Sequence, residues 1–152
     1  LIKARDTRTL RRDFEGYSDN ASYALIGIGA SAISRFPQGY VQNASATSIY
    51  RKLVRQGSLA GNRGYELTRN EQVVACMIEM LMCRFEIDFD AVHRQFPNSA
   101  DFVDKLADGL RKVYKTHLKI SQNRLAIKKR SHPLARMVCN TLDQLAGSTS
   151  AC

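Results

Sequence analysis

Apolar residues recur every three or four positions through the second half of the chain, which is the spacing of one helix face. The clearest stripe follows Thr68-Arg-Asn-Glu71, which has the form of a capping box at a helix start. Its apolar members are Val73, Val74, Met77, Ile78, Leu81, Met82 and Phe85. We predict that this stripe belongs to the protein core and not to a cofactor site.

Similar spacing and turn residues predict further elements along the chain. These are a helix from Ala46 that ends at Gly57, a short helix over 88–96, a helix over 99–114, a hairpin near 116–128 and a last helix that begins with Pro133. The order of helices and hairpin is close to a winged-helix plan. We therefore expect a mainly α fold with a small β component.

The first forty residues show no sustained helical period, and glycines concentrate in the stretch "LIGIGASAISR" at 25–35. The apolar run "YALI" leads into it as a strand would. We expect two parts: a Gly-rich strand and loop segment over 1–44, and a helical C-terminal domain over 45–152.

The spacing Gly27-x-Gly29-x-x-Ala32 satisfies the fingerprint of a dinucleotide-binding turn. The surrounding sequence contradicts that function, because Pro37 follows too soon for a helix and no Asp or Glu occurs from Asn20 to Tyr65. A phosphate-loop lysine is also missing. What remains is a strand whose backbone at Gly27 and Gly29 admits close approach, by a ligand or by another strand.

Length and composition fit one globular domain of 152 residues with 44% hydrophobic content. No apolar run reaches the roughly 20 residues of a membrane span, and the start has no secretory h-region. We expect a cytoplasmic protein with buried, reduced cysteines, no metal site and no membrane partner. Because the chain opens on Leu1, we also expect a fragment of a longer protein.

The formal charge of +9 is concentrated in one region, since residues 105–136 hold ten Lys or Arg and the single acid Asp108. The rest of the chain holds thirteen residues of each sign. Such a region suits an anionic partner, such as nucleic acid, a polycarboxylate ligand or an acidic protein. An ordinary solvated face is the alternative interpretation.

Several motifs resemble the segment after the barrel of oxygen-independent coproporphyrinogen III oxidases, a radical SAM family. "RRDFEGYSDNASYALIGIGASAIS" is similar to the family's H-R-N-F-Q-G-Y-T and L-[LI]-G-x-G-V-S-A-I-S. "YVQN", "LTRNE" and "MCRFEIDF" resemble Y-x-Q-N, L-T-x-x-[DE] and [IL]-C-x-F-x-[LI]-D-[FY]. "ARMVCNTLDQL" resembles the C-terminal R-N-I-C-M-x-F-D. These motifs follow in order along nearly the whole chain.

The resemblance implies an enzyme of heme biosynthesis that decarboxylates two propionates of coproporphyrinogen III to vinyl groups without oxygen. It implies S-adenosylmethionine and a 4Fe–4S cluster, which together generate a 5′-deoxyadenosyl radical. The cluster needs C-x-x-x-C-x-x-C, which this sequence lacks. We therefore expect the cofactors in a full-length enzyme with an upstream barrel. The chain alone is expected to bind neither cofactor and to be inactive, with no catalytic or metal-binding residue of its own.

Three residues match positions near S-adenosylmethionine in the family. Ile33 matches the isoleucine beside the adenosyl group, and Phe14 with Glu15 matches a Phe-Gln pair near a second S-adenosylmethionine. Glu15 replaces glutamine and adds a negative charge, while Ala30 replaces valine and Asp13 replaces asparagine.

Two alternative functions stay open at this point. The first is a winged-helix module that binds nucleic acid, although the resemblance implies no nucleic-acid partner. The second is a radical SAM heme-binding paralogue, whose glycine strand usually reads G-[IL]-G-x-G-A-H-G. Ser31-Ala32-Ile33-Ser34 fits the oxidase pattern better.

Overall fold

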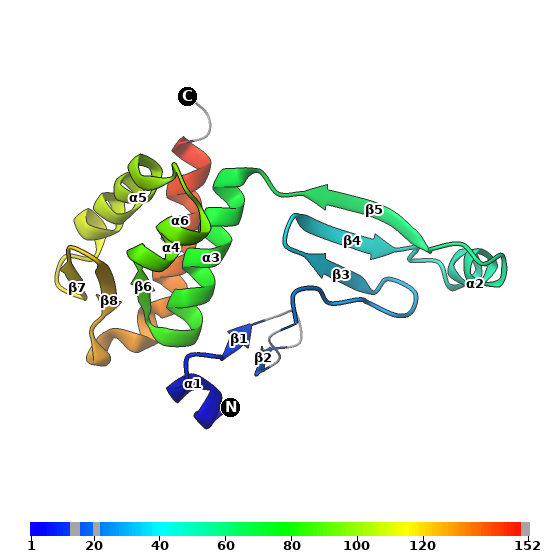
Figure 1. The fold of residues 1–152 in the computed structure, drawn as a ribbon, viewed down its shortest axis with the longest axis horizontal. Coiled ribbons are helices and arrows are strands. Elements are labelled where there is room, and N and C mark those ends of the chain that lie inside the picture. The colour runs from blue at the N-terminus through cyan, green and yellow to red at the C-terminus, as the bar shows by residue number, and fades with distance from the viewer. Residues whose placement is uncertain (13–15, 20–21, 150–152) are drawn as a thin grey trace. The chain divides into compact units, whose positions relative to one another are not determined.

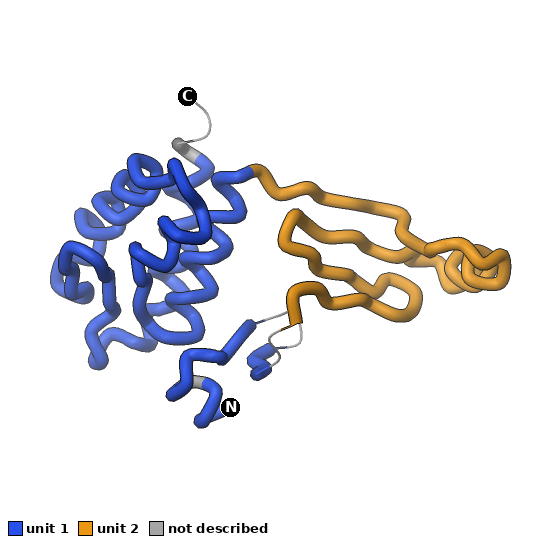
Figure 2. The backbone as a smooth tube through the Cα atoms, in the orientation of Figure 1, with its two compact units in different colours: residues 1–21, 69–152 blue, residues 22–68 orange. Residues whose placement is uncertain are grey.

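The computed structural model describes residues 1–12, 16–19 and 22–149 of the chain (Figure 1). They form two compact units (Figure 2). Unit 1 comprises residues 1–21 and 69–152, and unit 2 comprises residues 22–68. About half of the residues are helical and the sheets are small and antiparallel, which confirms a mainly helical fold with a minor β component.

Unit 1 holds most of the helices and two of the sheets. Its elements are α1 (Ile2–Asp6), β1 (Arg11–Arg12), β2 (Tyr17–Ser18), α3 (Arg69–Arg84), β6 (Glu86–Asp88), α4 (Phe89–Gln95), α5 (Ala100–Val113), β7 (Leu118–Ser121), β8 (Arg124–Ile127), the 3-10 helix η1 (Lys129–Leu134) and α6 (Ala135–Thr149). The predicted helices over 68–85, 88–96 and 99–114 are confirmed to within about two residues.

The core of unit 1 lies between α3, α5 and α6, where α6 packs against both other helices. The α3 stripe faces this core: Met77 and Leu81 are fully buried, and Ile78 packs against them in part. Leu110 of α5 and Leu142 of α6 complete the centre. This burial confirms the predicted assignment of the stripe to the core. Each fully buried side chain of this kind contributes about 1.5–3 kcal/mol to stability.

The predicted hairpin is present as β7 and β8, and β6 pairs with its second strand to give the order β6-β8-β7. Ile87 lies opposite Leu125, and Leu118 lies opposite Ile127. All four side chains are buried, so this small sheet closes one side of the helical core. Strand β6 was not predicted, because three residues are too few to show an alternation.

The last helix does not begin where the sequence predicted. Pro133 lies inside η1 and not at the first position of the last helix, which begins at Ala135. The amide of Ser131 donates to Lys128 O at 2.7 Å, so the chain makes a tighter turn before the α-helix begins. The last helix continues to Thr149.

Unit 2 is a three-stranded antiparallel sheet, β3 (Ile33–Phe36), β4 (Gly39–Asn43) and β5 (Gly61–Glu66), with α2 (Thr47–Arg55) between the last two strands. The prediction that α2 ends at Gly57 is confirmed. Gly57 has φ +74°, and the amide of Ser58 reaches back to Leu53 O at 3.0 Å, which closes the helix end.

The glycine stretch is not the strand that the sequence predicted. Only Leu25 forms a bridge, with Arg35 of β3, and the residues between Leu25 and Ile33 form a loop. The regular strand begins after the glycines, at Ile33. We call residues 25–32 the glycine loop.

The two units divide the chain at different places from the expected parts 1–44 and 45–152. Residues 45–68, expected in the helical domain, form unit 2 together with residues 22–44. Residues 1–21 cluster with the helices of unit 1. In the part of the chain that the structure describes, no helix has the length and apolar character that a membrane crossing requires.

Candidate functional site

Ile33, the residue matched to the adenosyl site, is the first residue of β3 and lies opposite Gln42 of β4. Ile33 therefore lies at one end of the unit 2 sheet. At this end β4 finishes at Asn43, which lies opposite Gly61 at the start of β5. The glycine loop enters β3 here, and α2 connects β4 to β5 here. Ile33, the glycine loop and α2 therefore share one end of one sheet.

The two motif glycines are explained by the conformation of the chain itself. A Cβ atom on Gly27 would lie 2.7 Å from the backbone oxygen of Ile33, closer than real Cβ atoms approach. Gly29 has φ +115°, a conformation that side chains other than hydrogen disfavour. The sequence predicted a close approach to Gly27 by a ligand or by another strand, and in the structure the backbone of Ile33 makes this approach.

Four side chains hydrogen-bond to the backbone of the glycine loop, and one of them is Gln42, whose Nε2 donates to Ser31 O at 3.2 Å. The amide Nδ2 of Asn43 donates to Gly27 O at 3.1 Å and to Gly29 O at 3.0 Å. Gly27 N donates to Ser34 Oγ at 3.1 Å, and Gly29 N donates to Tyr50 Oη at 3.0 Å. Hydrogen bonds from β3, β4 and α2 therefore fix the loop, although none of its residues is buried.

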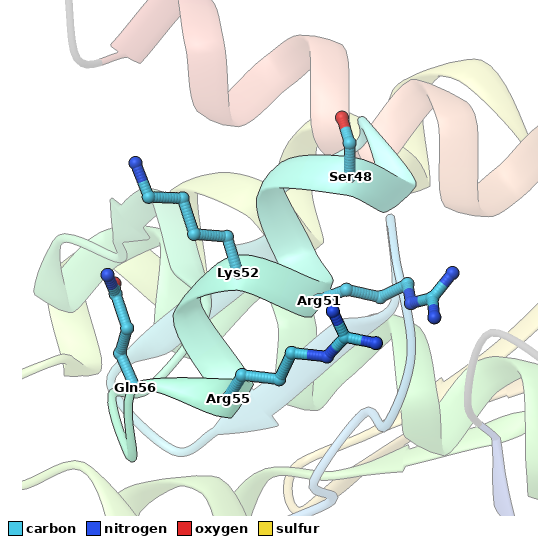
Figure 3. Close-up of a pocket in the computed structure, with 5 residues that line it drawn as sticks. All are labelled: Ser48, Arg51, Lys52, Arg55 and Gln56. Carbon is cyan, nitrogen blue, oxygen red and sulfur yellow. The ribbon is translucent and has the colours of Figure 1, made fainter.

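The outer face of α2 is cationic. Ser48, Arg51, Lys52, Arg55 and Gln56 line an open cavity of about 400 Å³ (Figure 3). In this view the side chains of Arg51 and Arg55 extend toward the same side of the helix. The only side chains of α2 that are not exposed are Tyr50 and Leu53, so all three cations of the helix are exposed.

Unit 2 also exposes large apolar side chains. Ile28 is 87% exposed and Leu59 is 94% exposed, and Ile26, Ile49 and Tyr65 are more than half exposed. Its buried residues within the described part are small, with Ala44 and Ala60 as the apolar ones. A contiguous sheet with so little core of its own is typical of a surface that another protein part covers.

Cys76, Cys83 and Cys139 are free cysteines of unit 1. Among the residues that the structure describes, no group of three His, Cys, Asp or Glu side chains is placed to hold a metal ion. Burial raises the pKa of Cys76, Cys83 and Cys139 to about 11, and the carboxylate of Glu79 adds to the effect at the first two.

The basic region 105–136 lies entirely in unit 1. Part of its charge is used within the unit: Arg111 pairs with Asp108 at 3.3 Å, Arg124 pairs with Glu86 at 3.3 Å, and Lys128 donates to Thr116 O at 2.8 Å. This region and Ile33 therefore belong to different units. Phe14 and Glu15, the other two residues matched to a cofactor site, lie outside the described residues.

The sequence interpretation missed Asn43, Tyr50 and the cations of α2. Asn43 was visible as the last residue of the "YVQN" motif, to which no role was given. The cations of α2 could have been found from the sequence, because no Asp or Glu occurs from Asn20 to Tyr65 to neutralise them. That absence was used only as an argument against a ribose-binding site. The positive charge of α2 was overlooked because the charges outside residues 105–136 sum to zero.

Comparison with known proteins gives a consistent result at the level of sequence and fold. No protein-family model matches the chain. It is 38% identical over 144 residues to anaerobic coproporphyrinogen III oxidase 1 of Cereibacter sphaeroides, covering 94% of this chain and 32% of that protein. It is 35% identical over 143 residues to the oxygen-independent coproporphyrinogen III oxidase of Paracoccus denitrificans, covering 94% of this chain and 32% of that protein.

The fold is similar to that of a solved radical SAM enzyme. The structure of coproporphyrinogen III oxidase (HemN) from Escherichia coli matches with a TM-score of 0.80 and 27% identity, over 93% of this chain and 33% of that chain. The chain spans about a third of the length of the relatives that it matches.

Proposed function

We propose that this chain is the C-terminal portion of an oxygen-independent coproporphyrinogen III oxidase, because it is homologous to about one third of the length of such enzymes. The observation that carries the proposal is the 38% identity over 144 residues, together with a TM-score of 0.80 to the Escherichia coli enzyme. The whole enzyme would convert two propionates of coproporphyrinogen III to vinyl groups, giving protoporphyrinogen IX. The similar proteins carry the name of this oxidase, which favours it over a nucleic-acid-binding module or a heme-binding paralogue.

The chain's own cysteines do not fit the 4Fe–4S cluster. They lack the C-x-x-x-C-x-x-C spacing that such a cluster needs. The cluster ligands would therefore come from an upstream barrel in the same chain. S-adenosylmethionine and the cluster, when bound together, supply a radical that abstracts hydrogen from the substrate.

The residues of unit 2 fit one wall of an adenosyl site. Ile33 would contact the adenosyl group as an apolar surface, since small residues surround it in the sequence. Asn43 and Tyr50 would keep the glycine loop in place beside it. Phe14 and Glu15 would contribute to a second S-adenosylmethionine site. The exposed apolar side chains of unit 2 would be covered by the barrel.

Two experiments test this proposal. The coding sequence upstream of Leu1 should contain C-x-x-x-C-x-x-C, and its absence would contradict the proposal directly. The full-length protein, prepared without oxygen, should form protoporphyrinogen IX only when S-adenosylmethionine is present. The 152-residue chain alone should form none.

Ile33→Asp in the full-length enzyme tests the adenosyl wall separately. The affinity for S-adenosylmethionine should fall while the visible spectrum of the cluster stays unchanged, because the variant adds a charge to an apolar wall. An unchanged affinity would remove Ile33 from the site.

A further inference from the structure

Unit 2 carries a strong positive charge that its own residues do not neutralise. Residues 22–68 contain Arg35, Arg51, Lys52, Arg55 and Arg63, and Glu66 is their single acid. The described residues provide no ion pair or hydrogen bond for the side chains of Arg51, Lys52 and Arg55. Three of the five cations thus lie on the nine residues of α2.

The arrangement on α2 brings two guanidinium groups to one place. Arg51 and Arg55 are four residues apart, so they are neighbours on the helix surface. Like charges at this spacing destabilise a helix, and an anion between them removes that cost. Ser48 and Gln56 add neutral hydrogen-bonding groups to the same open cavity of about 400 Å³.

The position of α2 ties these cations to the proposed adenosyl wall. Its Tyr50 accepts the hydrogen bond from Gly29 N, and Asn43 just before the helix holds the same loop. The helix joins the strand ends at which Ile33 begins β3. The hydrogen taken from the substrate must lie close to the adenosyl group, so the substrate must reach this end of the sheet.

We propose that the Arg51–Arg55 pair on α2 binds a carboxylate of the tetrapyrrole substrate, with Lys52 close by for a second one. This inference rests on the proposed function. The substrate carries four propionates, and a guanidinium group binds a carboxylate with two parallel hydrogen bonds. The basic region 105–136 belongs to the other unit, whereas α2 contacts the glycine loop directly through Tyr50.

The test uses the full-length enzyme with both arginines replaced, as Arg51→Gln with Arg55→Gln. The KM for coproporphyrinogen III should rise about tenfold or more, since charge-assisted hydrogen bonds are lost. The kcat at saturating substrate and the affinity for S-adenosylmethionine should stay within about twofold, because both groups act in binding alone. Higher ionic strength should raise the KM of the unsubstituted enzyme more than that of the variant.

Two matched controls remove one charge each without touching α2. Arg63→Gln lies on exposed β5 of the same unit, and Lys119→Gln lies on β7 in the basic region of unit 1. Both should leave the KM within about twofold. An unchanged KM in the double variant, or an equal rise in either control, would overturn the proposal.

The experiment distinguishes substrate binding by α2 from a purely structural role of α2 and from a failure of the proposed function. If the double variant loses affinity for S-adenosylmethionine together with thermal stability, α2 serves to dock unit 2 on the barrel, and the substrate proposal is wrong. If the unsubstituted full-length protein shows no oxidase activity, the proposed function fails. Fluorescence titration with coproporphyrin III, the stable tetracarboxylate, then still decides whether Arg51 and Arg55 bind such a ligand.

Discussion

The backbone amide of Gly29 donates a hydrogen bond to the hydroxyl of Tyr50 across 3.0 Å, joining the glycine loop to α2. The bond connects a segment without buried residues to a helix that is itself mostly exposed. Its loss should therefore be felt locally before it affects the whole protein.

Tyr50→Phe removes the only acceptor that the described residues give to this amide. We expect the Gly29 amide to exchange with solvent roughly fivefold faster, which corresponds to a loss of about 1 kcal/mol for one hydrogen bond. Amide hydrogen exchange measures this directly. Tyr23→Phe is the control, because Tyr23 is 83% exposed and should show no change. Equal exchange in both variants would mean that the bond contributes nothing.

Gly27→Ala should destabilise unit 2 by about 2 kcal/mol or more, since the added methyl meets the Ile33 backbone at 2.7 Å and the backbone must shift. Thermal unfolding and limited proteolysis within residues 22–68 measure the effect. Gly64→Ala is the matched control on β5, where the nearest atom, Tyr40 O, lies 3.8 Å from the new Cβ. The prediction fails if both variants behave alike.

Ile28→Asp distinguishes a covered surface from a solvated one. In the isolated chain Ile28 is 87% exposed, so the substitution should change the unfolding free energy by less than about 0.5 kcal/mol. In the full-length enzyme the same change should cost about 2 kcal/mol or more, because the barrel would bury the side chain. Chemical unfolding of both proteins provides the comparison. A neutral effect in both would argue against a covering barrel.

The buried thiols predict a loss of stability at alkaline pH. The pKa of Cys76, Cys83 and Cys139 is raised to about 11 from the ordinary 9.0, first by burial. Between these values the unfolded chain releases thiol protons that the folded chain keeps. The stability that the buried neutral thiols contribute to the folded state is therefore fully present below pH 9.0 and is lost as the pH rises toward about 11.

Urea unfolding across that pH interval measures the decline. A variant with Cys76→Ala, Cys83→Ala and Cys139→Ala should show a shallower slope of unfolding free energy against pH, even though it starts from a lower stability. Identical slopes would show that other groups cause the decline.

Glu86 joins distant parts of unit 1, with Oε1 at 3.2 Å from Arg8 and Oε2 at 3.3 Å from Arg124. Its side chain is only 19% exposed, so Glu86→Gln should lower the unfolding free energy by about 1–2 kcal/mol. Asp108→Gln, which breaks the exposed pair with Arg111, should cost less than about 0.5 kcal/mol. Thermal unfolding at low and high salt compares the two, and equal losses would contradict the difference in burial.

The sequence predicted the parts of the fold whose pattern is local. The α3 stripe and the 116–128 hairpin were recognisable because burial follows helical or alternating spacing within one segment. The unit 2 sheet was missed since all six residues of β5 are exposed, with two glycines among them, and no alternation marks the strand. Its pairing with β4 is a long-range property that local spacing does not encode.

The candidate site shows the same division. Ile33 was placed near the site by its motif, whereas Asn43 and Tyr50 act through contacts with Gly27 and Gly29 that only the folded chain reveals. The sequence around the motif glycines argues against a dinucleotide site, and this stays a prediction. Their actual reason, a backbone contact at Gly27 and a positive φ at Gly29, required coordinates.

The division of unit 1 into residues 1–21 and 69–152 has a consequence for biosynthesis. Ala4 and Leu10 are buried with Cys83, a residue that leaves the ribosome more than seventy positions after them. The first segment must therefore wait, without its partner, while all of unit 2 is synthesised. Unit 2 can form its strand pairs during this interval, so the two units would fold in the reverse of the order in which the chain begins them.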